Sequence, residues 1–176
     1  MSLSEQQKAD AATIMPLLLQ DEKGLQFSRF TNDDALTLGN IIVHLAKERV
    51  PYKGISILIT RNGQVLFQHS MEGTTVDNED WLRRKNNTVI RLQHSSYYIG
   101  RELASKGLID MEKTYRVSMN DYACHGGGFP ILIKDVGCVG AIVVSGLKQY
   151  EDHLLVTQGI RELITKMEQQ QQQQQC

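Results

Sequence analysis

Hydrophobic and polar residues follow a helical period over much of this chain. Between Asn32 and Arg49, apolar residues recur every three or four positions and form one stripe, with Thr31 or Asn32 as the N-cap. A helix is also predicted over residues 4–22, where Ser4 begins a capping-box pattern. Pro16 lies inside that segment and is expected to kink the helix or to begin a second one. The same spacing predicts further helices over residues 77–92, 95–106 and 149–167.

Other segments have the pattern of β-strands, and two pairs of them form predicted hairpins. Residues 55–60 and 65–71 are rich in β-branched and apolar residues, and they flank Asn62-Gly63, the pair that favours a type I′ turn. Residues 129–134 and 138–144 flank a second predicted turn. Short strands are expected over residues 25–29 and 115–118. Strands joined by hairpins give an antiparallel sheet, so the order of elements predicts an α+β fold rather than a doubly wound α/β fold.

The chain is expected to form one domain. Its 176 residues suffice for a single hydrophobic core. We expect one α+β domain over residues 1–168, with the N-terminal helical segment 4–22 included, and a Gln-rich tail over residues 169–176. The tail either extends the last helix or frays, and we assign no function to it.

Composition and charge exclude several classes of protein. The formal net charge is −1, which leaves no basic excess to neutralise phosphates, so we expect no nucleic-acid partner. The apolar runs are too short to cross a bilayer, and the N-terminus lacks the basic start and apolar core of a signal peptide. We therefore expect a cytoplasmic protein with no membrane partner. The three cysteines, Cys124, Cys138 and Cys176, match no zinc spacing.

The most unusual segment is the run His125-Gly126-Gly127-Gly128, just before a predicted strand. Three glycines let the backbone approach a ligand closely and leave amides free to donate hydrogen bonds. His125 adds an acid–base group or a ligand. The alternative is a tight structural loop whose residues need positive φ. The segment lacks the Gly-Lys-Ser/Thr ending of a phosphate loop.

A second candidate segment, Ser145–Lys148, joins a predicted strand to the last helix. Such a turn presents amides at the positive end of a helix, where anions bind, and Lys148 adds charge. The alternative is a plain turn with Ser145 as the cap. Asp152 and His153 follow on the helix, and an Asp-His pair in such a place is usually a solvated face.

His94 and Ser95 join two predicted helices and form a third candidate segment with the tyrosines that follow. These residues either line a polar pocket, or His94 ends one helix and Ser95 caps the next. The basic residues at positions 83, 84, 85 and 91 are expected to be solvated or to pair with another subunit, with a carboxylate site as the alternative. His44 and His69 are expected to be structural.

The second hairpin brings two of these segments together. The start of its first strand lies beside the end of its second strand, so Gly128 is expected near Ser145. We therefore predict one concave site for a small anionic ligand. Its candidate residues are His94, Ser95, His125, Gly126, Gly127, Gly128, Ser145, Gly146, Lys148 and His153. No Gly-x-Ser-x-Gly elbow is present, and the residues alone assign no catalytic group and no metal ligand.

Four segments stand in a characteristic order along the chain: Thr60–Val65 with Met71–Gly73, Arg84–Thr88, Gly127–Ile131 and Val139–Gly146. In this order they resemble the HbpS/GlcG-like family, also called the haem-degrading domain family, and more closely its uncharacterised bacterial and fungal branch. The likeness runs from about residue 30 to residue 163. The combination of segments is specific, whereas each segment alone is not.

The resemblance implies a profilin-like fold, in which helices pack around a central antiparallel sheet, and symmetric homo-oligomers. Relatives bind haem, so the resemblance makes haem the candidate cofactor, but it carries over no axial ligand. We expect a non-catalytic protein that binds a small molecule or acts as an accessory factor. Two alternatives stay open because fold does not fix function: an enzyme that acts on a small anionic molecule with a histidine acid–base group, and a protein-interaction subunit.

Overall fold

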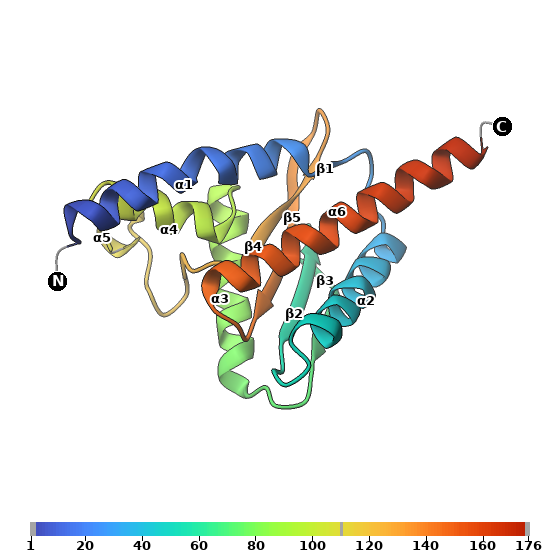
Figure 1. Ribbon diagram of the computed structural model, residues 1–176, viewed down its shortest axis with the longest axis horizontal. Coiled ribbons are helices and arrows are strands. Elements are labelled where there is room, and N and C mark those ends of the chain that lie inside the picture. The colour runs from blue at the N-terminus through green and yellow to red at the C-terminus, as the bar shows by residue number, and fades with distance from the viewer. Residues whose placement is uncertain (1–2, 110, 175–176) are drawn as a thin grey trace.

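One five-stranded sheet with helices on both faces forms the protein. The structure is a computed structural model that describes residues 3–109 and 111–174. The strands lie in the order β1-β4-β5-β2-β3 (Figure 1). The strands are β1 (Gln26–Phe27), β2 (Ser56–Arg61), β3 (Gln64–Ser70), β4 (Gly128–Ile133) and β5 (Gly137–Ser145), and the helices are α1 (Glu5–Gly24), α2 (Asn32–Arg49), α3 (Val76–Leu92), α4 (Ser96–Ser105), α5 (Met111–Tyr115) and α6 (Gln149–Gln174).

The two faces of the sheet carry separate hydrophobic cores. Helices α2 and α6 cover one face and α3 covers the other, while α1 runs alongside α4 at one end of the molecule (Figure 1). Because successive strand residues point to opposite faces, Ile57 and Ile59 pack toward α2 and α6, whereas Leu58 packs against Leu82 and Val89 of α3. The predicted α+β class is confirmed.

Local sequence signals place most of the elements correctly. Helix α2 begins after Thr31, which forms a capping box with Asp34. In the β2–β3 turn, Asn62 and Gly63 both have positive φ, 50° and 81°, as a type I′ turn requires. Strands β4 and β5 pair antiparallel, as expected. Only β1 departs from the antiparallel pattern, because it pairs parallel with β4 at the edge of the sheet.

One local expectation was wrong, and two others had left alternatives open. Helix α1 continues through Pro16 as a single helix, so a second helix does not begin there. Pro16 removes the hydrogen bond to the carbonyl of Ala12, but both residues are exposed, so water can satisfy that carbonyl. Residues 115–118 do not form a strand, because α5 ends at Tyr115 and Arg116 takes a positive φ of 53°. The glutamines extend α6 as far as Gln174.

No helix in residues 3–109 and 111–174 combines the length and the apolar character needed to cross a membrane.

Candidate functional site

A buried ion pair lies between α3, α6 and the end of β5. The ammonium of Lys85 donates hydrogen bonds to Asp152 Oδ2 at 3.0 Å and to the carbonyl of Val144 at 2.9 Å. The side chains of Lys85 and Asp152 are only 3% and 2% exposed. Breaking such a pair leaves an uncompensated charge in the interior, and keeping it adds little net stability over an apolar core. A buried pair of this kind beside a cavity marks a candidate functional site.

Asp152 also fixes the backbone where β5 turns into α6. Its Oδ1 accepts the amide of Leu147 at 3.0 Å, and the amide of Gly146 donates to the same carboxylate. Burial raises the pKa of Asp152 to about 6, although the charge of Lys85 and these hydrogen bonds pull it down. Burial also disfavours the charged form of Lys85, and it therefore lowers the pKa of the lysine. The amides of the turn just before α6 are therefore occupied by the chain's own carboxylate.

The glycine run makes room for this pair. A Cβ on Gly127 would lie 2.3 Å from the carbonyl oxygen of Val144 and 2.8 Å from Lys85 Nζ, and Gly127 has a φ of +116°. A Cβ on Gly126 would lie 1.9 Å from the carbonyl oxygen of Gln149. The glycines thus let three segments approach closely, which is the structural alternative considered for them. The amide of Gly128 donates to Ser96 Oγ at 2.9 Å.

A small cavity opens beside the ion pair. We call it the Trp81 cavity. It encloses about 220 Å³ and is lined by Asp77, Asn78, Trp81, Lys85, His125, Gly126, Ser145, Leu147, Gln149 and Asp152. The rings of Trp81 and His125 meet edge-on at 4.9 Å, and the guanidinium of Arg84 covers the Trp81 ring at 4.1 Å. Burial lowers the pKa of His125, and the positive charges of Lys85, Arg84 and Arg101 lower it further.

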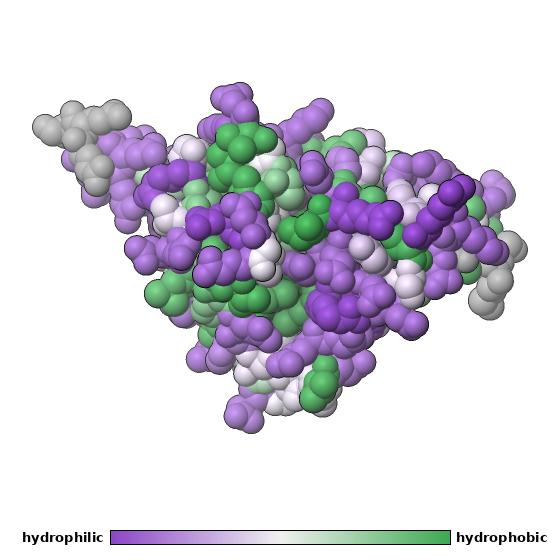
Figure 2. Space-filling model, turned by 180° about the vertical axis from the view of Figure 1, so that it is seen from behind, coloured by the Kyte–Doolittle hydropathy of each residue, from purple (hydrophilic) through white to green (hydrophobic). Residues whose placement is uncertain are grey.

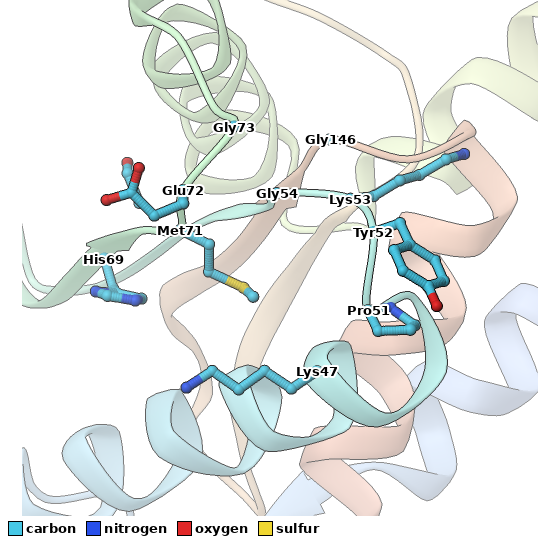
Figure 3. Close-up of a pocket in the computed structure, with 11 residues that line it drawn as sticks. Lys47, Pro51, Tyr52, Lys53, Gly54, His69, Met71, Glu72, Gly73 and Gly146 are labelled. Atoms are coloured by element: carbon cyan, nitrogen blue, oxygen red, sulfur yellow. The ribbon is translucent and has the colours of Figure 1, made fainter.

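A larger groove lies on the other side of the β5–α6 turn. We call it the Lys47 groove. It encloses about 690 Å³ and is lined by Lys47, Pro51, Tyr52, Lys53, Gly54, His69, Ser70, Met71, Glu72, Gly73 and Gly146. Figure 3 shows Lys47 on α2 and the side chains of His69 and Met71, from the end of β3, pointing into the same space. Lys53 points outward at the opposite rim, and Tyr52 is 98% exposed.

The groove and the cavity share a wall. Gly146 lines the Lys47 groove, whereas its neighbours Ser145 and Leu147 line the Trp81 cavity. The proximity that the hairpin predicted is seen in the register, where Gly128 pairs with Val143 and Ser145 pairs with Ser56 of β2. His125, Gly126 and Ser145 are thus brought together at one hollow.

The other candidate histidines have different surroundings. Glu22 of α1 accepts the amide of Ser95 and contacts His94 Nδ1, both at 2.7 Å, and this contact raises the pKa of His94. His153 is 3% exposed, and the centre of its ring lies 5.2 Å from that of Tyr97 and 5.9 Å from that of Phe129. Neither of its ring nitrogens has a hydrogen-bond partner among the described residues. His94 and His153 therefore lie outside the Trp81 cavity.

Lys148 is exposed and does not line either hollow. Its amide donates to Glu151 at 3.0 Å. The cation at the Trp81 cavity is Lys85 instead. Within the described residues, no three His, Cys, Asp or Glu side chains are grouped so that they could hold a metal ion.

Sequence reasoning missed Lys85, Asp152 and Trp81 as parts of one site. From the sequence, Lys85 is expected to be solvated or to pair with another subunit, with a carboxylate site as the alternative, and Asp152 is expected on a solvated face. A signal was present, because Lys85 stands three residues after Leu82 and four before Val89, on the buried stripe of α3. A charged residue on an apolar stripe predicts a buried partner.

Known proteins are similar to this chain in both sequence and fold. The sequence model of the family described as "Haem degrading protein HbpS-like" matches residues 30–161. A UPF0303 protein of Streptomyces coelicolor is 42% identical over 156 residues, which cover 89% of this chain and 97% of that protein. A UPF0303 protein of Psychromonas ingrahamii is 40% identical over 151 residues, 86% of this chain and 93% of that protein.

Solved structures agree with this likeness. The Ybr137w protein is 32% identical, with a TM-score of 0.81, and the match covers 92% of this chain and 95% of that one. The PduOC:haem complex is 15% identical, with a TM-score of 0.63 over 75% of this chain and 93% of that one. At the latter identity the likeness shows the fold alone.

Proposed function

This chain belongs to the HbpS-like family, and on that basis we propose that it is a haem-binding accessory protein whose ligand lies in the Lys47 groove. The observation that carries the proposal is the groove itself. It combines a volume of about 690 Å³ with a histidine, a methionine and a lysine that face one space (Figure 3).

The size of each hollow decides where haem can bind. Pockets for drug-sized ligands enclose roughly 300–1,000 Å³. Haem is at least as large as a drug-sized ligand, so it needs a pocket in this range. The Trp81 cavity, at about 220 Å³, is too small. The Lys47 groove, at about 690 Å³, falls within the range.

The side chains of the groove suit the parts of a haem. Imidazole and thioether groups are axial ligands of haem iron, and His69 and Met71 supply one of each. The Lys47 ammonium would hold a propionate through a charge-assisted hydrogen bond. The exposed ring of Tyr52 would gain a flat apolar partner. Bound haem would supply the redox chemistry of its iron.

Haem titration of the purified full-length protein tests this assignment. We expect the wild type to bind haem with a shift of the Soret band. The double variant His69→Ala/Met71→Ala should bind at least about 10–100-fold more weakly, because it removes both candidate iron ligands. Lys47→Met should weaken binding by roughly tenfold, since a hydrogen bond to a charged group is lost.

A matched control uses another exposed histidine. His44 lies on α2, where it contacts Glu48 at 3.2 Å, and it does not line the groove. His44→Ala should leave the titration unchanged. An unchanged Soret band in the His69→Ala/Met71→Ala variant would contradict the groove assignment. Loss of the band on changing His125 would contradict it as well.

A homo-oligomer is the second part of the proposal. Strand β3 pairs with β2 on one side only, and in the described residues no strand pairs with its other side. Its sequence contains no lysine and no proline, which are the residues that usually protect an edge, and only a bulge near Leu66 interrupts it. The face seen from behind carries hydrophobic patches (Figure 2), and Val65 of β3 is 52% exposed.

Light scattering at micromolar protein should give a native mass several times that of the 19.9 kDa chain. Val65→Lys should lower that mass, because it places a charge at the open edge. Val136→Lys is the matched control at the tip of the β4–β5 turn, where the valine is 70% exposed. A monomeric wild type would contradict the proposal, and so would an equal effect of both variants.

A further inference from the structure

The Trp81 cavity contains a buried ammonium that still has a proton to donate. Asp152 and Val144 accept two of the three protons of Lys85 Nζ. Within the part of the chain that the structure describes, no atom accepts the third. Lys85 lines the cavity, and its Nζ lies 5.9 Å from the centre of the Trp81 ring. A ligand atom that accepts a hydrogen bond would give the third N–H of the Lys85 ammonium a partner.

The electrostatic surroundings of His125 favour a negative charge. After burial, the groups that lower the pKa of its imidazole are the positive charges of Lys85, Arg84 and Arg101. Two carboxylates also line the cavity, and both have partners, since Asp77 accepts the indole N–H of Trp81 at 3.1 Å and Asp152 pairs with Lys85. An anion beside His125 would therefore meet a positive potential.

The walls of the cavity set the shape of the ligand. Trp81 and Leu147 form apolar surface, and Ser145 adds a polar residue to the wall. A volume of about 220 Å³ equals on the order of seven waters, each of which occupies about 30 Å³ in the liquid. The cavity thus suits a molecule with roughly that number of non-hydrogen atoms or slightly more.

From these observations we infer that the Trp81 cavity is a second ligand site, which takes a small carboxylate with a flat apolar body. Lys85 and His125 would bind the carboxylate, and the Trp81 ring would cover the body. This gives a reason for the buried Lys85–Asp152 pair. Asp152 orients the ammonium, because its own carboxylate is held by the amides of Gly146 and Leu147. The inference is independent of haem binding, which we place in the Lys47 groove.

Trp81 reports on this site directly, because it is the only tryptophan in the chain. We would titrate the full-length protein at pH 7 with sodium benzoate and, separately, with benzamide, its neutral isostere, and record tryptophan fluorescence. Benzoate should change the emission of Trp81 saturably, with at least tenfold tighter binding than benzamide, because a hydrogen bond to a charged group replaces one to a neutral group.

Two histidine variants complete the experiment. His125→Gln keeps a side chain of similar length without the imidazole, and it should weaken benzoate binding by about tenfold. His44→Gln, at an exposed site on α2, should have no effect. Saturable benzoate binding that is weakened in His125→Gln and unchanged in His44→Gln supports the inference. Equal binding of benzoate and benzamide, no saturable signal with either probe, or an unchanged His125→Gln variant would overturn it. The haem titration is read separately from the Soret band, so either proposal can fail alone.

Discussion

Lys85→Met is expected to lower the free energy of unfolding by about 3–5 kcal/mol, because it leaves the carboxylate of Asp152 buried without its partner. Both side chains are 3% exposed or less, so the remaining carboxylate of Asp152 stays largely out of contact with bulk solvent. The thioether of methionine fills most of the same space and leaves the carbonyl of Val144 without the lysine that donates to it. Urea denaturation followed by circular dichroism measures the loss.

A second substitution separates lost charge pairing from lost packing. The double variant Lys85→Met/Asp152→Leu should regain a large part of the stability, since replacing both charges by apolar groups is often neutral or stabilising. Lys106→Met, which breaks a surface pair between Lys106 and Glu102, should cost at most about 1 kcal/mol. A Lys85→Met variant as stable as the wild type would mean that Asp152 is not buried as a charge.

His153→Phe is expected to protect the protein against acid. Burial lowers the pKa of His153 to about 4, from the usual 6.5 of a histidine in water. Below pH 6.5 the imidazole of His153 is therefore protonated in the unfolded chain but stays neutral in the folded chain. The free energy of unfolding consequently falls as the pH falls. The loss amounts to about 3 kcal/mol between pH 7 and pH 4. Phenylalanine has nothing to protonate, and it keeps an aromatic ring beside those of Tyr97 and Phe129.

The comparison is made as a difference between the two proteins at each pH. Asp152 titrates in the opposite sense, because its pKa is raised to about 6 and its protonation in the folded state adds stability as the pH falls. Both proteins contain Asp152, so the difference isolates His153. Urea denaturation at pH 7, 6, 5 and 4 should show a gap that widens with acidity. Parallel curves for the two proteins would contradict the burial of a neutral imidazole.

Features of the fold that depend on neighbouring residues could be predicted from the sequence. The capping box at Thr31 and the Asn62-Gly63 turn are local, and both have the expected geometry. The closeness of the glycine run to Ser145 followed from one hairpin, which again requires only local pairing. By contrast, Arg116 takes a positive φ of 53° that nothing in its sequence signals, so the strand expected over residues 115–118 was wrong.

The candidate sites depend on contacts that no local pattern specifies. Lys85 and Asp152 are 67 residues apart, and only the packing of α3 and α6 around the end of β5 joins them. His69 was expected to be structural, yet it is exposed and lines the Lys47 groove. The groove is formed by α2, the loop after it, the end of β3 and Gly146, and none of these segments is unusual in composition.

The position of iron in a crystal of the haem-loaded protein decides where haem binds. With X-rays tuned to the iron absorption edge, we expect one anomalous peak in the Lys47 groove, within bonding distance of His69 or Met71 and on the side of the groove that Lys47 faces. A peak beside Trp81 and His125, or a fully loaded protein whose iron contacts neither His69 nor Met71, would contradict the proposed site.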